Sequence, residues 1–286
     1  MQFAINVPNF GDTGDPATFL RLARDAEAAG WDGLFVWDHI LVGHEWGLPI
    51  SDPWALLSAA AAVTERIMLA PMVTPLPRRR PWVVARQAVT LDRLSGGRVL
   101  LGVGLGHPPA AEFGAFDDET DARRRAEMLD EGLAILDGLW SGAPFAFAGA
   151  HYRLERMVFQ PVPVQRPRIP IIVAGYWPNR APFRRASRWD GVAPLPRDGE
   201  EGMPITPSDL RDALAFVAEH RADATAPFEV VVAGQSPTDP PEARGFFDAY
   251  ADAGATWWSE DVNTQRGSLA DMFDLVAAGP SGRDHT

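Results

Sequence analysis

The sequence predicts an α/β fold in which eight parallel strands close into a (β/α)8 TIM barrel, and three observations support this prediction. Short apolar runs alternate with helical patterns along the chain, which is typical of a parallel sheet buried on both faces. Eight such units fit into 286 residues, close to the roughly 250 residues of a typical barrel. The turn at residues 8–12 lacks the GxGxxG pattern that a doubly wound open sheet would carry there.

Strands are expected where apolar residues run together, and helices where they recur every three or four positions. Gly30 is expected to end the first helix, and Asp52 to cap the second, which begins at Pro53. The expected strands are residues 3–7, 33–37, 67–73, 98–103, 171–174, 191–193, 228–233 and 255–258. The expected helices are residues 16–29, 53–63, 81–94, 117–140, a helix from 178, and residues 207–221, 242–253 and 268–277. A single domain over residues 1–286 is predicted, with a short insertion around residues 141–170.

The composition excludes several classes of chemistry. The chain has 26 basic and 38 acidic residues, a net charge of −12, and neither cysteine nor lysine. Disulfides, zinc–thiolate sites, a phosphate-binding P-loop lysine and a pyridoxal Schiff base are therefore excluded. The acidic balance argues against nucleic acid and anionic membranes as partners. No apolar run approaches ~18 residues and the first residues lack a basic or long apolar stretch, so neither a membrane span nor a secretory signal is expected.

Candidate catalytic residues follow the expected strands, because the active site of such a barrel lies at the carboxyl ends of its strands. Asp38 and His39 follow the second strand, where the Asp could orient the imidazole of a general acid or base. The alternative is a loop histidine bonded to a helix cap. His107 follows the fourth strand. A metal site involving His39, His44 and Glu45 is disfavoured, because their spacing is not HExxH.

Two glycine-containing turns could approach a ligand closely. Gly102–Gly106 resembles a phosphate-cradling loop only superficially, and a tight turn between strand and helix is the favoured interpretation. The segment 174–180 places a glycine turn before a helix with proline first, and backbone N–H groups at such a helix start attract a phosphate. Simple helix capping is the alternative. Arg180 would add a charged contact or point to solvent.

Arginine runs and tryptophans have two interpretations each. Arg78–Arg80 is interpreted first as a solvated loop, and second as a grip on an acidic cofactor tail or a neighbouring subunit. Arg123–Arg125 is expected to pair with surface acids of its own helix. Tryptophans near the expected barrel mouth favour an apolar or aromatic substrate, or simply pack; they are Trp37, Trp46, Trp177 and Trp258.

Several segments together resemble the luciferase-like flavin-dependent oxidoreductases, the family of bacterial luciferase-like monooxygenases. The segments that carry this resemblance are residues 30–39, 69–75, 88–98, 102–106, 174–175, 189–191 and 254–258. The resemblance implies a (β/α)8 barrel that binds reduced FMN or the deazaflavin coenzyme F420, in a cytoplasmic dimer. The sugar-phosphate dehydrogenases of the deazaflavin branch carry Glu and Asn where this chain has His107 and Ala110. Sugar-phosphate oxidation is therefore not expected.

The same resemblance implies roles for individual residues. Asp38 and His39 would face the ring, and a non-proline cis peptide at Met72–Val73 would press a bulge against its rear face. His107 would stand beside the ring and phosphate. The remaining cofactor-binding residues implied or expected are Thr74, Gly104, Leu105, Gly106, Ala174, Gly175, Tyr176, Trp177 and Arg180.

The predicted function is a monooxygenase-type oxidoreductase that uses reduced FMN from a separate flavin reductase, or F420, to oxidise a small apolar organic substrate. His39 would serve as its proton donor or base. The alternatives are an F420-dependent hydride-transfer dehydrogenase or reductase, a non-catalytic flavin-binding paralogue and a metal-dependent hydrolase. A homodimer is expected, with neither a metal, a nucleic acid nor a membrane as partner.

Overall fold

Nine strands of the computed structural model form one parallel sheet, and the structure describes residues 1–42, 47–197 and 202–281. Within these residues the strand order is β3-β2-β1-β11-β10-β9-β8-β5-β4. The strands of this sheet are β1 (Gln2–Val7), β2 (Gly33–Val36), β3 (Met68–Pro71), β4 (Thr74–Pro75), β5 (Leu101–Gly104), β8 (Ile171–Trp177), β9 (Gly191–Pro196), β10 (Glu229–Gly234) and β11 (Trp257–Asp261).

The sheet closes on itself between β3 and the residues just before β5. The Leu69 amide donates to the Arg98 carbonyl over 2.8 Å, and the Leu100 amide donates to the Leu69 carbonyl over 3.0 Å. Beyond Met72–Val73, β4 continues the line of β3 and pairs with β5, with Thr74 opposite Val103. Since β3 and β4 together form one strand of the barrel, the predicted (β/α)8 barrel is confirmed.

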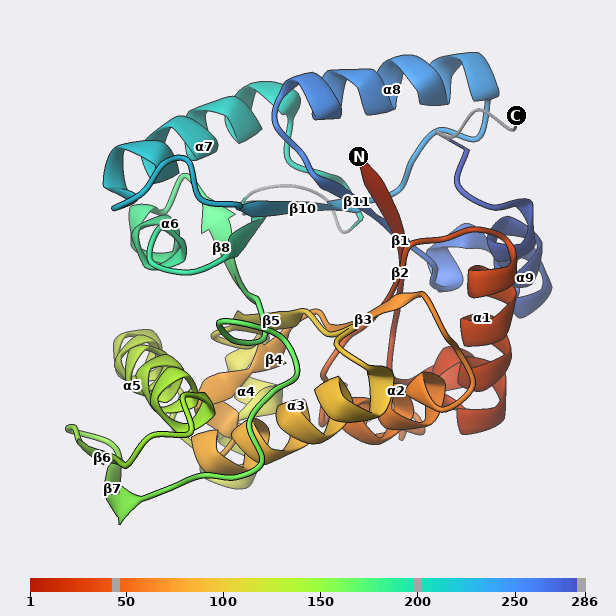
Figure 1. Ribbon diagram of the computed structural model, residues 1–286. Coiled ribbons are helices and arrows are strands. Elements are labelled where there is room, and N and C mark those ends of the chain that lie inside the picture. The colour runs from red at the N-terminus through yellow and green to blue at the C-terminus, as the bar shows by residue number, and fades with distance from the viewer. Residues whose placement is uncertain (43–46, 198–201, 282–286) are drawn as a thin grey trace.

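Helices surround the outside of this barrel (Figure 1). Asp52 caps α2 as predicted, because its carboxylate accepts from the Ala55 amide over 2.9 Å. The described helices are α1 (Pro16–Ala28), α2 (Pro53–Ala61), α3 (Pro81–Ser95), α4 (Pro109–Glu112), α5 (Ala122–Trp140), α6 (Arg180–Ala186), α7 (Pro207–His220), α8 (Pro240–Asp252) and α9 (Leu269–Ala278), with 3₁₀ turns η1 (Gly11–Gly14), η2 (Leu76–Arg78), η3 (Gly114–Phe116) and η4 (Thr264–Arg266).

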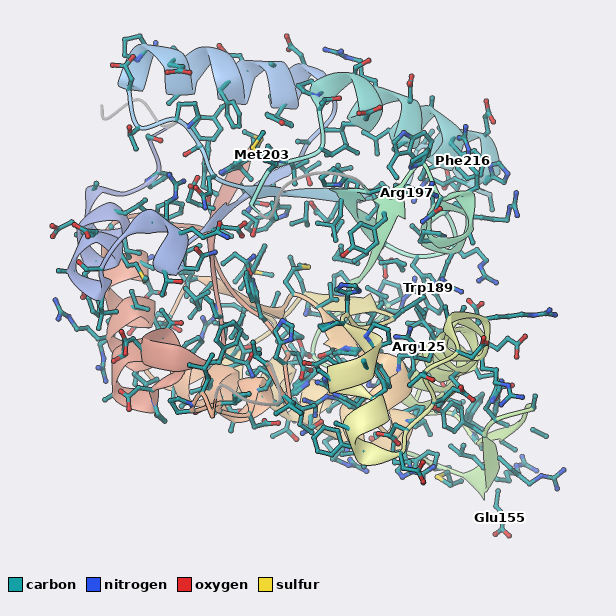
Figure 2. All side chains as sticks on the ribbon, turned by 180° about the vertical axis from the view of Figure 1, so that it is seen from behind. Arg125, Glu155, Trp189, Arg197, Met203 and Phe216 are labelled. Atoms are coloured by element: carbon teal, nitrogen blue, oxygen red, sulfur yellow. The ribbon has the colours of Figure 1, made fainter. Side chains whose placement is uncertain are left out.

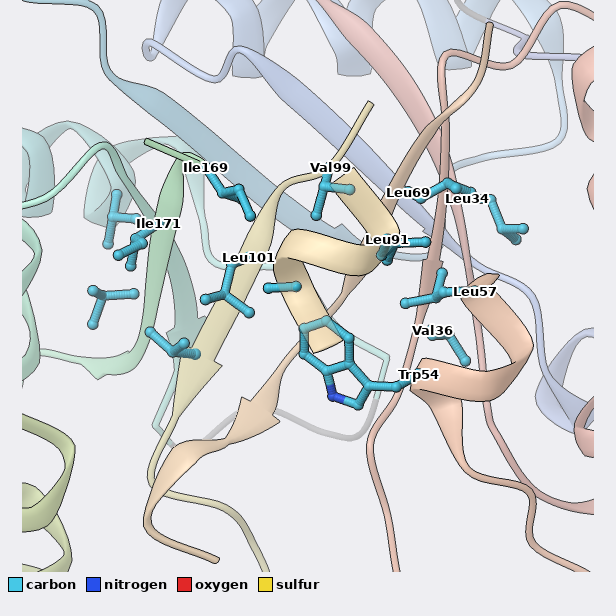
Figure 3. Packing of buried hydrophobic residues seen from close by; sticks show 14 of the residues in the cluster. Leu34, Val36, Trp54, Leu57, Leu69, Leu91, Val99, Leu101, Ile169 and Ile171 are labelled. Atoms are coloured by element: carbon cyan, nitrogen blue, oxygen red, sulfur yellow. The ribbon is translucent and has the colours of Figure 1, made fainter. Parts of the chain in front are cut away.

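Buried apolar side chains form two layers, because successive strand residues point to opposite faces of the sheet. The larger layer lies between the sheet and the helices, where Leu34 and Leu69 face Leu57 of α2 and Leu91 of α3 (Figure 3). The smaller layer fills the barrel interior and consists of Ala4, Phe35, Ala70, Leu100, Ile172, Ala193, Val231 and Trp257. The barrel is therefore packed below its mouth.

Three predicted helix starts were wrong by two or more residues, and one of them is α8, which was expected from Glu242 but begins at Pro240 after its cap Asp239. The helix expected from Asp117 begins at Ala122, because the Asp121 side chain caps it by accepting from the Arg124 amide over 2.9 Å. The helix expected from Pro178 begins at Arg180, because β8 runs on to Trp177 through its pairing with β9. The turn expected at residues 175–177 is therefore strand.

The insertion predicted around residues 141–170 contains an antiparallel hairpin of β6 (Phe145–Ala148) and β7 (Arg153–Met157). This hairpin lies outside the barrel, and Glu155 at its end points away from the molecule (Figure 2). Within the described residues, no helix combines the length and apolarity needed to cross a membrane. The single-domain organisation stays a prediction.

Candidate active site

Polar side chains occupy the barrel interior near its carboxyl rim. Asn6 of β1 and Ser259 and Asp261 of β11 share the inward face with Ala4 and Trp257, because they alternate with the outward residues. The Asn6 amide nitrogen donates to Asp261 Oδ1 over 2.8 Å. Asn6 Oδ1 and Ser259 Oγ are buried, and neither has a hydrogen-bond partner in the described part of the chain. Because buried polar atoms are normally paired, these two atoms suit a bound polar group.

A group of charged side chains, here called the His39 cluster, lies at the rim beside β2, and its members are Asp38, His39, Arg78, Arg79 and Glu112. His39 Nδ1 lies 2.8 Å from Glu112 Oε1. Arg78 forms ion pairs with both carboxylates, at 2.6 Å from Asp38 Oδ1 and with Glu112 Oε2. Arg79 Nη2 lies 2.7 Å from Asp38 Oδ1. These contacts join the end of β2 to η2 and α4.

Burial and mutual attraction oppose each other in this cluster. Burial lowers the pKa of Arg78, although the charge of Asp38 opposes that effect. Burial would also lower the pKa of Arg79, but the charge and hydrogen bonds of Asp38 outweigh it and raise that pKa. Both guanidinium groups therefore stay charged, since arginine deprotonates only at extreme pH. Two cations balance two carboxylates, which makes burial of all four groups tolerable.

The structure corrects two expectations here and adds one residue that the sequence analysis missed. Asp38 does not orient His39: its carboxylate accepts from Arg78, from Arg79 and from Thr74 Oγ1, the last over 3.0 Å. Arg78 and Arg79 are not in a solvated loop, because their side chains are only 5% and 19% exposed. Glu112 was missed, because it lies 73 residues from His39 in the sequence. The available signal was an acidic residue between apolar neighbours.

The chain between β3 and β4 bulges toward β5. The Met72–Val73 peptide bond is cis, as the family resemblance implied. A Cβ at Gly102 would lie 2.5 Å from the Pro71 carbonyl oxygen, and one at Gly104 would lie 2.8 Å from Val73 Cγ2. The glycines of β5 therefore make room for this bulge.

The turn after β5 is held from outside the barrel by Arg125 of α5. The guanidinium donates to the carbonyls of Leu105 and Gly106 over 2.8 and 2.9 Å and lies 4.6 Å from the centre of the Phe113 ring. The expectation that Arg125 pairs on the surface was wrong. For its two neighbours the expectation is confirmed: Arg124 pairs with Glu119 and Arg123 with Glu127.

A second group at the rim, here called the Tyr176 rim, consists of His107, Tyr176, Asn179 and Arg197. His107 is exposed, and its ring lies edge-on to Tyr176 with centroids 6.5 Å apart. Arg197 donates to Asn179 Oδ1. Partial burial raises the pKa of Tyr176, so its phenol is neutral at ordinary pH. This side of the mouth faces solvent.

Other residues expected at this side point elsewhere. The Trp177 ring packs against Phe183 in the helical layer, with centroids 5.0 Å apart. Arg180 stacks over Trp177 and over Phe216, which lies in α7 on the outside of the barrel (Figure 2). A Cβ at Gly175 would lie 2.2 Å from Pro182 Cβ, so packing against α6 already requires that glycine.

Of the tryptophans expected near the barrel mouth, Trp37 lies beside His39, whereas Trp258 lies in the core. The Trp37 ring lies near the His39 ring, with centroids 5.8 Å apart. Trp258 is fully buried, and its indole donates to Glu260 Oε2 over 2.7 Å. Trp46, His44 and Glu45 fall outside the described residues. Within the described ranges no group of three or more His, Asp or Glu side chains could hold a metal ion.

A closed (β/α)8 barrel with a histidine and a buried charge cluster at its carboxyl rim has the architecture of a barrel enzyme, whose active site lies at that rim. The family model described as luciferase-like monooxygenase matches residues 1–261. The chain therefore belongs to the luciferase-like monooxygenase family.

Two curated proteins of this family are similar to the chain in sequence. The 4-hydroxyprotoasukamycin monooxygenase of Streptomyces nodosus subsp. asukaensis is 35% identical over 214 residues, 72% of this chain and 54% of that protein. An F420-dependent glucose-6-phosphate dehydrogenase of Beutenbergia cavernae is 33% identical over 275 residues, 94% of this chain and 78% of that protein. This chain thus spans about half of the first relative and over three quarters of the second.

Solved structures share the fold at low identity. An F420-dependent secondary alcohol dehydrogenase, in complex with an F420–acetone adduct, has a TM-score of 0.79 at 17% identity, covering 99% of each chain. The oxygenating constituent of 3,6-diketocamphane monooxygenase from Pseudomonas putida, in complex with FMN, has a TM-score of 0.73 at 16% identity, covering 97% of each chain. Relatives of this chain therefore use either cofactor.

Proposed function

We propose that this chain is a monooxygenase-type oxidoreductase that binds reduced FMN, or F420, at the carboxyl rim and oxidises a small apolar organic substrate, with dioxygen as the oxidant in the reaction of reduced FMN. The observation that carries the proposal is His39, whose imidazole is held at the barrel mouth by the buried carboxylate of Glu112. When bound, the cofactor supplies the redox chemistry that amino acids lack. His39 is positioned to donate or accept the proton that accompanies it.

The residues present fit such a cofactor. Both candidate rings carry N–H groups, and the buried acceptor Asn6 Oδ1 lacks a donor in the described part of the chain. Ser259 Oγ can donate or accept beside it. Met72, Val73, Thr74, Gly104, Leu105, Gly106, Ala174 and Tyr176 remain the proposed contacts around the ring. Because the Trp177 and Arg180 side chains pack outward, the proposed phosphate contacts near Gly175 are with main-chain amides.

Exposed apolar side chains support an apolar substrate. Large hydrophobic residues that face solvent follow several strands at the rim, where an apolar substrate would cover them. These residues are Ile40 after β2, Phe116 after β5 and Met203 after β9, joined by the half-exposed ring of Tyr176 at the end of β8.

Hydride transfer with F420 is the second candidate, and the two F420-dependent relatives favour it. In that reaction His39 would remove the proton of a substrate hydroxyl group. His107 and Ala110 differ from the residues expected of sugar-phosphate dehydrogenases, which favours a neutral alcohol over a sugar phosphate.

The test is a titration of the purified protein with FMN, with anaerobically reduced FMN and with F420, followed by absorbance and fluorescence. Saturable binding of one of them is expected, and its identity chooses between the two reactions. Asn6→Ala should weaken that binding, whereas Glu155→Ala, in the outlying hairpin, should leave it unchanged. Binding of none of the three would overturn the proposal.

A homodimer and a separate flavin reductase complete the proposal. Between α2 and α3 lies a surface groove of about 300 Å³, in which Trp54 Nε1 and Gln87 Oε1 are buried without partners among the described residues. A second copy is proposed to dock over this groove. Light scattering on the full chain should give twice the monomer mass, and a monomer would contradict this. The cytoplasmic location stays a prediction.

A further inference from the structure

The imidazole of His39 is fixed on several sides. Asn9, which is fully buried, accepts from the His39 amide over 3.1 Å and donates to the His39 carbonyl over 2.8 Å. The rings of Phe10 and Trp37 lie 5.6 and 5.8 Å from the imidazole centroid. The backbone and the ring plane are thus both restrained, so the hydrogen-bond partner at Nδ1 selects which nitrogen carries the proton.

That partner is Glu112, and its own charge state follows from its contacts. Its side chain is only 1% exposed, yet Oε2 accepts from the Ile40 amide over 3.3 Å and pairs with Arg78. Arg78 also donates to Asp38 Oδ1 over 2.6 Å. A carboxylate held by a guanidinium stays ionised, and an ionised carboxylate only accepts hydrogen bonds. The 2.8 Å contact with His39 therefore requires a proton on Nδ1.

We infer that Glu112 is a positioning residue that holds His39 as its Nδ1–H tautomer and so makes Nε2 the basic nitrogen. The inference rests on the proposed function for its consequence, because proton transfer by His39 is part of that proposal. Asp38, although adjacent in sequence, does not have this role, since its carboxylate is engaged by Arg78, Arg79 and Thr74. Sequence neighbours and spatial partners thus differ at this site.

The direct test reads the tautomer in the protein without any cofactor. Protein labelled with ¹⁵N-histidine is studied by long-range ¹H–¹⁵N correlation at pH 8, above the ordinary histidine pKa of about 6.5. His39→Gln identifies the His39 signals by their loss. Wild-type protein should show a protonated Nδ1 and an unprotonated Nε2. A proton on Nε2 in the wild type would overturn the inference, whatever the variants do.

Three variants separate positioning from general disruption. Glu112→Gln keeps the volume but offers an amide donor to Nδ1, so the proton should move toward Nε2. Glu112→Asp keeps the charge and should retain the Nδ1–H tautomer at least in part. Glu119→Gln is the matched control, because Glu119 caps a surface turn by accepting from the Asp121 amide. It should leave the His39 signals unchanged. An unchanged tautomer in folded Glu112→Gln would contradict the inference.

Turnover supplies the second readout once the titration above has identified the cofactor. Glu112→Gln should lower kcat by about 100-fold, a typical effect of losing acid–base catalysis, with cofactor affinity nearly unchanged. Unchanged kcat together with a shifted tautomer would overturn the role in proton transfer. If no cofactor binds, the proposed function fails, but the tautomer measurement still decides whether Glu112 positions His39.

Discussion

The His39 cluster and the Tyr176 rim both lie at the carboxyl rim of one barrel, yet they are built differently. In the His39 cluster the charged side chains are nearly all buried and each pairs with another within the cluster. In the Tyr176 rim the side chains are exposed, and the contacts are a ring edge and a single amide–guanidinium bond. The first arrangement fixes the imidazole of His39, the proposed proton-transfer group, whereas the second leaves its side chains in contact with solvent.

The difference also predicts what each side tolerates. Buried paired charges are sensitive to removal of one partner, because the other is left without compensation. The β8–α6 side contains close backbone packing at Gly175 and should be sensitive to added volume instead. Charge substitutions and volume substitutions therefore distinguish the two sides experimentally.

The largest effect is expected from Asp38→Asn. Its carboxylate pairs with both Arg78 and Arg79, and neutralising it leaves Arg78 with Glu112 and Arg79 with only the half-exposed Asp52, 3.5 Å away. The free energy of unfolding should fall by about 3–5 kcal/mol, measured by urea denaturation. Arg197→Gln on the Tyr176 rim is the control and should change it by less than about 0.5 kcal/mol. Equal losses in both variants would abolish the contrast between the two sides.

A smaller effect is expected from Gly175→Ala. The added Cβ would lie 2.2 Å from Pro182 Cβ in α6, and a proline ring cannot rotate away. Overpacking of this kind should cost about 1–3 kcal/mol of unfolding free energy. Gly245→Ala in α8 is the matched control, because nothing lies within 4 Å of its added Cβ. There the substitution should stabilise by about 0.5–1 kcal/mol through helix propensity. A neutral Gly175→Ala would mean that the glycine is not needed for packing.

The barrel could be predicted from the sequence because alternating strands and helices have local signals. The start of α5 was misplaced because the side chain that caps the helix, Asp121, lies four residues after Asp117, where the helix was predicted to begin. The end of β8 was misplaced because pairing with β9 extends the strand, and pairing depends on a distant segment. Local pattern thus predicts element type better than element ends.

The candidate site was predicted less completely, for a related reason. His39 follows a strand, so its place at the mouth could be predicted. Its partner Glu112 and the burial of Arg78 depend on contacts between segments far apart in the chain. An arginine run looks the same in the sequence whether it is solvated or buried. Charge pairing across the fold is therefore what sequence reasoning missed.

The smallest expected effect concerns ionisation on the open side. Partial burial raises the pKa of Tyr176, so the folded protein favours its neutral phenol. The resulting stabilisation is fully present below the unfolded pKa of about 10 and is lost as the pH rises through the folded value. Absorbance titration at alkaline pH should show three tyrosine transitions, and Tyr176→Phe should remove one centred above about 10.

Tyr250→Phe calibrates this measurement. Burial raises the pKa of Tyr250 to about 12, and its hydroxyl donates to the Ile205 carbonyl over 2.8 Å. The transition that Tyr250→Phe removes should have its midpoint at the same pH as that of Tyr176 or at a higher pH. The reason is that Tyr176 is 40% exposed, whereas Tyr250 is 3% exposed. If Tyr176 titrates at or below its ordinary value, the open side of the mouth is wetter than the structure indicates. The difference in hydration between the Tyr176 rim and the His39 cluster would then be larger than the structure indicates. A fully hydrated tyrosine loses its proton at its ordinary pKa, because burial no longer disfavours the charged form.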